Sequence, residues 1–134
     1  MREIDIAVID PFPERREELA QLIRKCAGNQ TGRLRIRQYG GADECPRQEI
    51  GCCHAIFMTL NSGEDVAAAH RLRPAPDSRW PLVVVTDYGR FSLDGHALWA
   101  RHCLRRPLRT EQVAEALSRC LDPEIWPEHG DFFR

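Results

Sequence analysis

Four short apolar runs of this sequence end in polar residues whose side chains could take part in metal binding or phosphoryl transfer. These residues are Asp10, Thr59, Thr86 with its neighbour Asp87, and Arg106. Carboxylate oxygens are the ligands that Mg²⁺ prefers, and a carboxylate can also be the nucleophile that accepts a phosphoryl group. A guanidinium can pair with carboxylates and neutralise them. The sequence therefore holds the residue types of an acidic phosphoryl-transfer site, provided that the fold brings the ends of these runs together.

Cysteine and histidine make a weaker case for chemistry. The six cysteines form no CxxC pair, and Cys52, Cys53 and His54 are adjacent rather than spaced as zinc ligands usually are. Cys26 and Cys120 fall on the apolar stripes of predicted helices, where a thiol acts as a small hydrophobe. No Cys, His and Asp come together at the ends of the apolar runs. We therefore expect reduced structural cysteines, no metal, no cofactor and no enzymatic activity.

The segments between the polar residues alternate between strand and helix patterns. Continuous or alternating apolar residues predict strands over residues 4–9, 33–38, 55–58, 82–86 and 102–105. Apolar residues spaced three and four apart predict a short, weak helix and four longer helices, over residues 41–49, 13–27, 64–73, 90–100 and 109–121. Pro13 and Glu14 suit the first turn of a helix, and Gly28 suits a helix end. The sequence thus reads as five β–α units.

This alternation predicts an α/β fold. Strands that alternate with helices become parallel neighbours joined by right-handed crossovers. Five such units indicate a flavodoxin-like, doubly wound parallel sheet in the order 2-1-3-4-5, with helices on both faces. Ligands and switch elements of such sheets lie at the carboxyl ends of the strands. Because the polar residues above stand at those ends, we expect them to gather at one edge of the sheet.

Length and composition set the limits of the molecule. The 134 residues suit one domain of ordinary size, and we assign residues 1–121 to it. Residues 122–134 contain Pro and Gly and are expected to be an extension or the start of a linker. Apolar residues make up 43%, enough for a core, while the net charge of −1 argues against a general polyanion binder. No run approaches the roughly 18 apolar residues of a membrane span, and no signal-peptide pattern is present, so we expect a cytoplasmic protein without membrane contact.

Segments at the strand ends resemble response-regulator receiver domains, the CheY-like family. The matching segments are residues 8–14, 86–93 and 103–108. Each segment stands on the strand where the family has it, and the resemblance extends over residues 4–121. The stretch 86–107 is most similar to receivers of the LytTR (AgrA-like) transcription regulators. The resemblance implies the receiver fold and a role in two-component signal transduction and phosphorelay.

The same positions depart from the active-site pattern of that family. Pro11 stands where the family has the second acidic residue of its Mg²⁺ site, and Thr59 stands where it has the phospho-accepting aspartate. Arg106 replaces the lysine of the family. Asp87 replaces the small residue that normally follows the switch threonine, here Thr86. The resemblance therefore implies a degenerate phosphorylation pocket that neither holds Mg²⁺ nor forms an aspartyl phosphate.

Arg106 is expected to take the place of the missing metal. Its guanidinium can pair bidentately with Asp10, Asp87 or both. In the resembled family the bond between the lysine and the following proline is typically cis, so we expect a cis bond before Pro107. Such a bond would direct the guanidinium into the pocket. The pocket would then be closed from within, and the domain would be held in one conformation.

These features predict a pseudo-receiver that regulates by protein contact, in transcription regulation for example. Its partner would be a second copy in a homodimer, an effector domain or another protein, and DNA would be reached only through an effector domain that this sequence lacks. The interface candidates are Phe91, Leu93, Trp99 and Arg105. The alternative is a flavodoxin-like small-molecule-binding domain, which would need a phosphate-cradling loop after the first strand. Residues 10–13 contain no glycine and few free amides for that purpose.

Simpler roles remain open for several of these residues. Asp10 could cap the following helix, Thr59 could be an ordinary strand-end residue, and Thr86 could simply fill the core. Trp99, together with Phe91 and Leu93, could belong either to the core or to an exposed patch. The arginines within residues 33–37 could form a solvated face rather than a nucleic-acid site.

Overall fold

The computed structural model of this chain describes residues 3–73 and 80–121, except for the side chains of residues 29–31, 92 and 93. The segment 122–134, expected to be an extension or a linker, lies outside the described residues. Within the described part, no helix is both long and apolar enough to cross a lipid bilayer.

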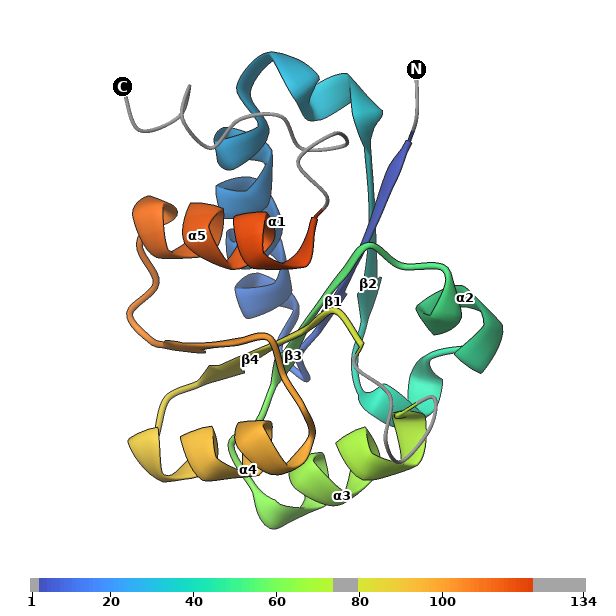
Figure 1. The fold of residues 1–134 in the computed structure, drawn as a ribbon, viewed down its shortest axis with the longest axis vertical. Coiled ribbons are helices and arrows are strands. Elements are labelled where there is room, and N and C mark those ends of the chain that lie inside the picture. The colour runs from blue at the N-terminus through green and yellow to red at the C-terminus, as the bar shows by residue number, and fades with distance from the viewer. Residues whose placement is uncertain (1–2, 74–79, 122–134) are drawn as a thin grey trace.

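The sheet is five-stranded and has the predicted order β2-β1-β3-β4-β5, with every neighbouring pair parallel (Figure 1). Its strands are β1 (Ile4–Ile9), β2 (Leu34–Tyr39), β3 (Ala55–Thr59), β4 (Leu82–Thr86) and β5 (His102–Arg105). β2 and β5 form the edges, and β1, β3 and β4 are buried almost throughout. The flavodoxin-like fold and the strand order are therefore confirmed.

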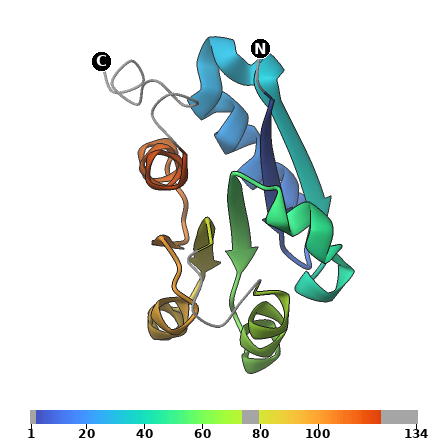
Figure 2. The ribbon, with the colours of Figure 1, turned by 45° about the vertical axis from the view of Figure 1, so that its right-hand side comes forward.

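Helices cover both faces of this sheet, as Figure 2 shows. The α-helices are α1 (Pro13–Ala27), α2 (Arg47–Gly51), α3 (Gly63–Leu72), α4 (Ser92–Ala97) and α5 (Thr110–Cys120). Three 3₁₀ turns accompany them, namely η1 (Gly28–Arg33), η2 (Ala42–Glu44) and η3 (Gly89–Phe91). α1 and α5 pack on one face, while α2, α3 and α4 pack on the other. Because strand side chains alternate between faces, Val8 joins the first core and Ala7 joins the second.

The fourth helix is shorter than the predicted segment 90–100. It ends because Trp99 adopts a left-handed backbone conformation with a φ of 61°. The Trp99 N–H donates to the carbonyl of His96, and the Ala100 N–H donates to that of Gly95, which closes the helix in a Schellman-type turn. Gly95 itself permits close packing on the sheet, since a Cβ there would lie 2.8 Å from the Cys103 sulfur. Periodicity alone signals neither constraint, because a glycine rather than a tryptophan usually occupies such a left-handed position.

Candidate functional site

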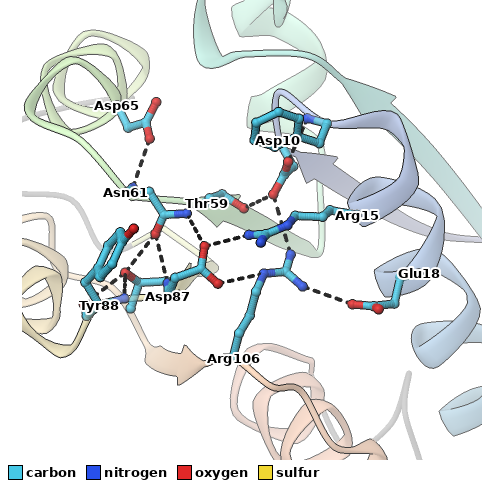
Figure 3. A network of polar contacts seen from close by, with 11 residues as sticks. Asp10, Arg15, Glu18, Thr59, Asn61, Asp65, Asp87, Tyr88 and Arg106 are labelled. Atoms are coloured by element: carbon cyan, nitrogen blue, oxygen red, sulfur yellow. Dashed lines mark hydrogen bonds and ion pairs between the residues drawn. The ribbon is translucent and has the colours of Figure 1, made fainter.

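The carboxyl ends of the strands carry the three buried polar residues of the described core. Asp10 is 1% exposed, Thr59 is 6% exposed and Thr86 is 1% exposed. Asp10 follows β1, whereas the two threonines are the last residues of β3 and β4. Buried polar groups need hydrogen-bond partners, and these three have them. The predicted gathering of polar residues at this edge of the sheet is present, as Figure 3 shows.

Asp10 is bound by groups of the protein on both carboxylate oxygens. Its Oδ1 accepts the backbone N–H of Phe12 at 2.8 Å, and its Oδ2 accepts the Thr59 hydroxyl at 2.5 Å. The Nη2 of Arg106 lies 3.5 Å from the same Oδ2. Asp10 does not cap α1, because the residue at the cap position is Phe12 and no side chain bonds to the helix there. Asp10 instead joins β1 to the ends of β3 and β5.

Asp87 is held chiefly by a residue that the sequence analysis did not single out. The Nη1 of Arg15 in α1 lies 2.5 Å from Asp87 Oδ2, and the Asn61 amide donates to the same oxygen at 2.6 Å. Burial alone would raise the pKa of the Asp87 carboxyl, but these two hydrogen bonds and the charges of Arg15 and Arg106 outweigh burial. The pKa of Asp87 is therefore held below its ordinary value.

Asn61 also ties the end of β4 to α3. Its Oδ1 accepts the backbone N–H of Asp87 at 2.8 Å, while its own N–H donates to Asp65 at 2.9 Å. The Thr86 hydroxyl lies 3.1 Å from the same Oδ1 and 3.0 Å from the carbonyl of Tyr88, and it accepts the Tyr88 N–H. Thr86 is thus more than core filling, but its hydroxyl bonds to Asn61 and to the backbone of Tyr88 instead of reaching Asp10. Asn61 was detectable in principle, since it closely follows a predicted strand.

Arg106 lies between the two acids, as predicted, with only 9% of its side chain exposed. Its Nη2 is 3.5 Å from Asp10, its Nε is 3.8 Å from Asp87, and its Nη1 is 3.0 Å from Glu18 of α1. The predicted pairing with both acids is therefore present, but the bidentate geometry is wrong, because each carboxylate faces a single guanidinium nitrogen. The shortest of these three ion pairs is the one to Glu18, which was not predicted. The peptide bond between Arg106 and Pro107 is cis, as the resemblance implied.

A Mg²⁺ ion of the kind that the receiver resemblance implies does not fit these residues. Both oxygens of Asp10 already accept hydrogen bonds, Pro11 supplies no carboxylate, and the Arg106 guanidinium occupies the space between Asp10 and Asp87. Over residues 3–73 and 80–121, no three His, Cys, Asp or Glu side chains gather closely enough to hold a metal ion. We call the contacts among Asp10, Arg15, Glu18, Thr59, Asn61, Asp87 and Arg106 the polar network. A cleft of about 420 Å³ beside it is lined by Arg15, Glu18, Asp87, Arg106, Pro107 and Leu108. The two arginines and the two acids of this lining balance one another in charge.

The four residues predicted to form an interface differ in how far they are exposed. Phe91, the last residue of η3, is only 7% exposed and packs in the core, so its prediction as an interface residue is wrong. The side chain of Leu93 lies outside the described residues. Trp99 is 49% exposed, which settles that it forms part of the surface. Arg105 at the end of β5 is also exposed.

The cysteines of the described residues are free thiols. Burial raises the pKa of Cys26 and of Cys120 to about 12, and that of Cys53 to about 11. Such thiols carry almost no thiolate at neutral pH and are poor nucleophiles. Cys26 and Cys120 both contribute to the core between α1, α5 and the sheet.

The Arg15–Asp87 pair predicts a measurable change in proton affinity. An Arg15→Gln substitution should raise the pKa of Asp87, because it removes the guanidinium that stabilises the carboxylate. Because the pKa of Asp87 is lower in the folded chain than its unfolded value of 3.8, the ionised carboxylate adds to the free energy of unfolding above pH 3.8. This contribution is lost as the pH falls through the folded-state pKa. The Asp87 carboxyl can be followed by ¹³C NMR between pH 2 and 7. Arg24→Gln, on the far end of α1, is the control and should leave the titration unchanged; equal curves for all three proteins would contradict the assignment.

Comparison with known proteins gives similarity at the level of structure. No protein-family profile matches this chain, and no curated protein sequence is similar to it. The response regulatory domain of protein mrkE from Klebsiella pneumoniae is similar, with a TM-score of 0.67 and 15% identity over 92% of this chain and 98% of that chain. A response-regulator receiver domain protein from Clostridium thermocellum has a TM-score of 0.69 and 11% identity over 93% and 99%. A putative pilus assembly protein, cpaE, from Burkholderia thailandensis has a TM-score of 0.67 and 23% identity over 87% and 97%. The chain thus has the fold of the CheY-like response-regulator receiver domains.

Proposed function

We propose that this protein is a pseudo-receiver, which acts in signal transduction through protein contact rather than through aspartyl phosphorylation or any other catalysis. The observation that carries the proposal is the hydrogen bond between Thr59 and Asp10, 2.5 Å long and buried. The resemblance places the phospho-accepting aspartate at the end of β3, and in this chain a threonine stands there and donates to the remaining acid. The position that would attack a phosphodonor is therefore occupied by a hydroxyl, which cannot form an aspartyl phosphate and whose proton is directed to Asp10.

The surrounding charges support the same proposal. A phosphoryl group entering the pocket would approach the Asp87 carboxylate, whose depressed pKa keeps it negative at neutral pH. No metal would offset that repulsion, since the cations that the described residues bring to the site are guanidinium groups already paired with Asp87, Asp10 and Glu18. The alternative of a flavodoxin-like small-molecule site is weaker. The loop after β1 offers few amides to a phosphate, because Pro11 and Pro13 have no N–H and the Phe12 N–H is bonded to Asp10.

The network also supports a fixed conformation. It connects α1 through Arg15, the loop after β3 through Asn61, the loop after β4 through Asp87, and the end of β5 through Arg106. In a switching domain these segments would have to move relative to one another. Here each is held by at least one charged partner on another segment. We infer a locked module whose contact surface is available without a phosphorylation signal.

The contact surface in this proposal is the one formed by α4, β5 and α5. Trp99 and Arg105 are exposed on it, and tryptophan and arginine are enriched at the centres of protein interfaces. The partner would be a second copy, an effector domain or another protein of the signalling pathway. A LytTR-type effector, as the resemblance to those transcription regulators implies, would supply the DNA binding.

Incubation with acetyl phosphate and Mg²⁺ tests the proposal directly. We expect the intact mass of the protein to stay unchanged, because the residue at the end of β3 offers no carboxylate nucleophile. Mg²⁺ should likewise leave the melting temperature unchanged. A receiver domain that labels under the same conditions serves as the positive control. Formation of a hydroxylamine-sensitive adduct on this chain would reject the proposal.

A further inference from the structure

A cationic cleft lies on the contact surface at the end away from the polar network. It has a volume of about 540 Å³ and is lined by His96, Trp99, Ala100, Arg101 and Arg119. Figure 1 shows α4 and α5 ending on the same side of the molecule, where β5 begins. Among the described residues, the lining therefore combines an aromatic ring with two guanidinium groups and includes no acidic side chain. Such a lining suits a segment that is both acidic and aromatic.

Trp99 is presented to this cleft by an unfavourable backbone conformation. Its φ of 61° lies in the left-handed region, which bulky side chains rarely adopt. Two backbone hydrogen bonds hold it there, and half of the side chain remains exposed. Residues kept in such conformations cluster at binding sites, because the surrounding structure maintains them for a purpose other than local stability. The ring is thus a candidate anchor for a ligand.

The two arginines of the cleft are weakly engaged within the described residues. Arg119 pairs with Glu115 one turn earlier on α5, at 3.2 Å, and both side chains are half exposed. Arg101 makes no ion pair with any carboxylate of residues 3–73 or 80–121. An exposed pair of this kind contributes little, so an incoming carboxylate can compete for the cations.

The remainder of this chain has the complementary composition. Residues 122–134 read DPEIWPEHGDFFR, with four acidic residues against one arginine. The same segment carries Ile125, Trp126, Phe132 and Phe133. It begins three residues after Arg119, and its thirteen residues can span up to about 43–47 Å when extended. The segment therefore reaches the cleft without difficulty and brings both negative charge and aromatic rings.

We propose that residues 122–134 dock into this cleft in cis, with apolar side chains against Trp99 and carboxylates against Arg101 and Arg119. Docking covers one end of the surface formed by α4, β5 and α5. A partner that uses this surface must then compete with the segment, which makes the segment a regulator of contact. The docking of the segment does not depend on the proposed function, whereas its role in regulating partner binding rests on that proposed function.

The order of the segment in the full chain tests the docking. In ¹⁵N-labelled protein, the backbone order parameters of residues 124–133 should be about 0.8, close to those of a rigid backbone, and should fall below about 0.6 in an Arg101→Glu, Arg119→Glu double variant. The indole signal of Trp126 should lose order with them. The matched control is Arg47→Glu, Arg71→Glu, the same charge change on α2 and α3. About 1 M NaCl, where the Debye length is about 3 Å, should weaken the docking in the wild-type chain.

Other results would overturn the proposal. Low order parameters in the wild-type chain would show that the segment does not dock, and high values unaffected by the double variant would place it elsewhere. Dependence on protein concentration would show docking between two copies rather than in cis. Folding of each variant is checked by the indole signal of Trp80, which donates to Leu98 inside the core. Trp99→Gly offers a second variant, since glycine fits the left-handed backbone, and it too should release the segment. None of these outcomes depends on whether the protein accepts a phosphoryl group.

Discussion

Replacing Arg106 by methionine should lower the free energy of unfolding by about 3 kcal/mol. The guanidinium is 9% exposed and lies 3.5 Å from the Asp10 carboxylate, which is itself 2% exposed. Methionine keeps the length of the aliphatic stem but removes the charge, so Asp10 becomes a buried carboxylate without a cation. Removal of one partner from a buried ion pair costs about 3–5 kcal/mol. We expect the lower end, because Thr59 and the Phe12 N–H still donate to Asp10.

Urea unfolding followed by circular dichroism measures this loss. Arg105→Met is the matched control, since Arg105 is adjacent but exposed, and its substitution should change stability by less than about 0.5 kcal/mol. Addition of Asp10→Asn to Arg106→Met should recover part of the loss, because it removes the unpaired charge. Equal costs for Arg105→Met and Arg106→Met would show that the network does not stabilise the fold.

The sequence predicted the sheet well because its signals are local and strong. β4 is β-branched at four of its five positions, while β1 is an apolar run interrupted only by Asp5 and β3 is apolar up to its last residue, Thr59. The alternation with helices then leaves little freedom in strand order. The position of Arg106 followed from the same logic, since the carboxyl ends of parallel strands meet at one edge.

The partners contributed by helices were harder to predict. Arg15 and Glu18 stand three residues apart on α1 and point toward the site from the polar side of that helix. An exposed-looking arginine gives no sign of the carboxylate it will meet, and Arg15 is 72 positions from Asp87. The interface assignment of Phe91 was wrong for a related reason. The sequence left both core and surface open for this ring, and only the structure places it, at the end of the 3₁₀ turn η3, in the core.

A Thr59→Asp substitution should be strongly destabilising in this chain, although it restores the residue type of a working receiver. The hydroxyl that now donates to Asp10 at 2.5 Å would be replaced by a second carboxylate at a site that is 6% exposed. Two buried carboxylates so close cannot both ionise without a large penalty, and Arg106 can offset only part of it. We expect a loss of about 3 kcal/mol or more at pH 7. The control is Thr59→Asn, because asparagine has nearly the same shape as aspartate but carries no charge. It should lower the free energy of unfolding by about 1 kcal/mol.

Mg²⁺ should then act on the redesigned pocket and not on the natural one. In a Pro11→Asp, Thr59→Asp double variant, the two new carboxylates and Asp10 provide oxygen ligands of the kind that Mg²⁺ prefers. Binding with a dissociation constant near 1 mM would return about 1.4 kcal/mol at 10 mM Mg²⁺, because a ligand that binds only the folded state stabilises it. The melting temperature of the double variant should therefore rise by a few degrees with Mg²⁺, while that of the wild-type chain and of Thr59→Asn stays constant. Stabilisation of the wild-type chain by Mg²⁺ to the same extent would mean that the natural pocket already holds the ion and that Pro11 and Thr59 have not abolished it.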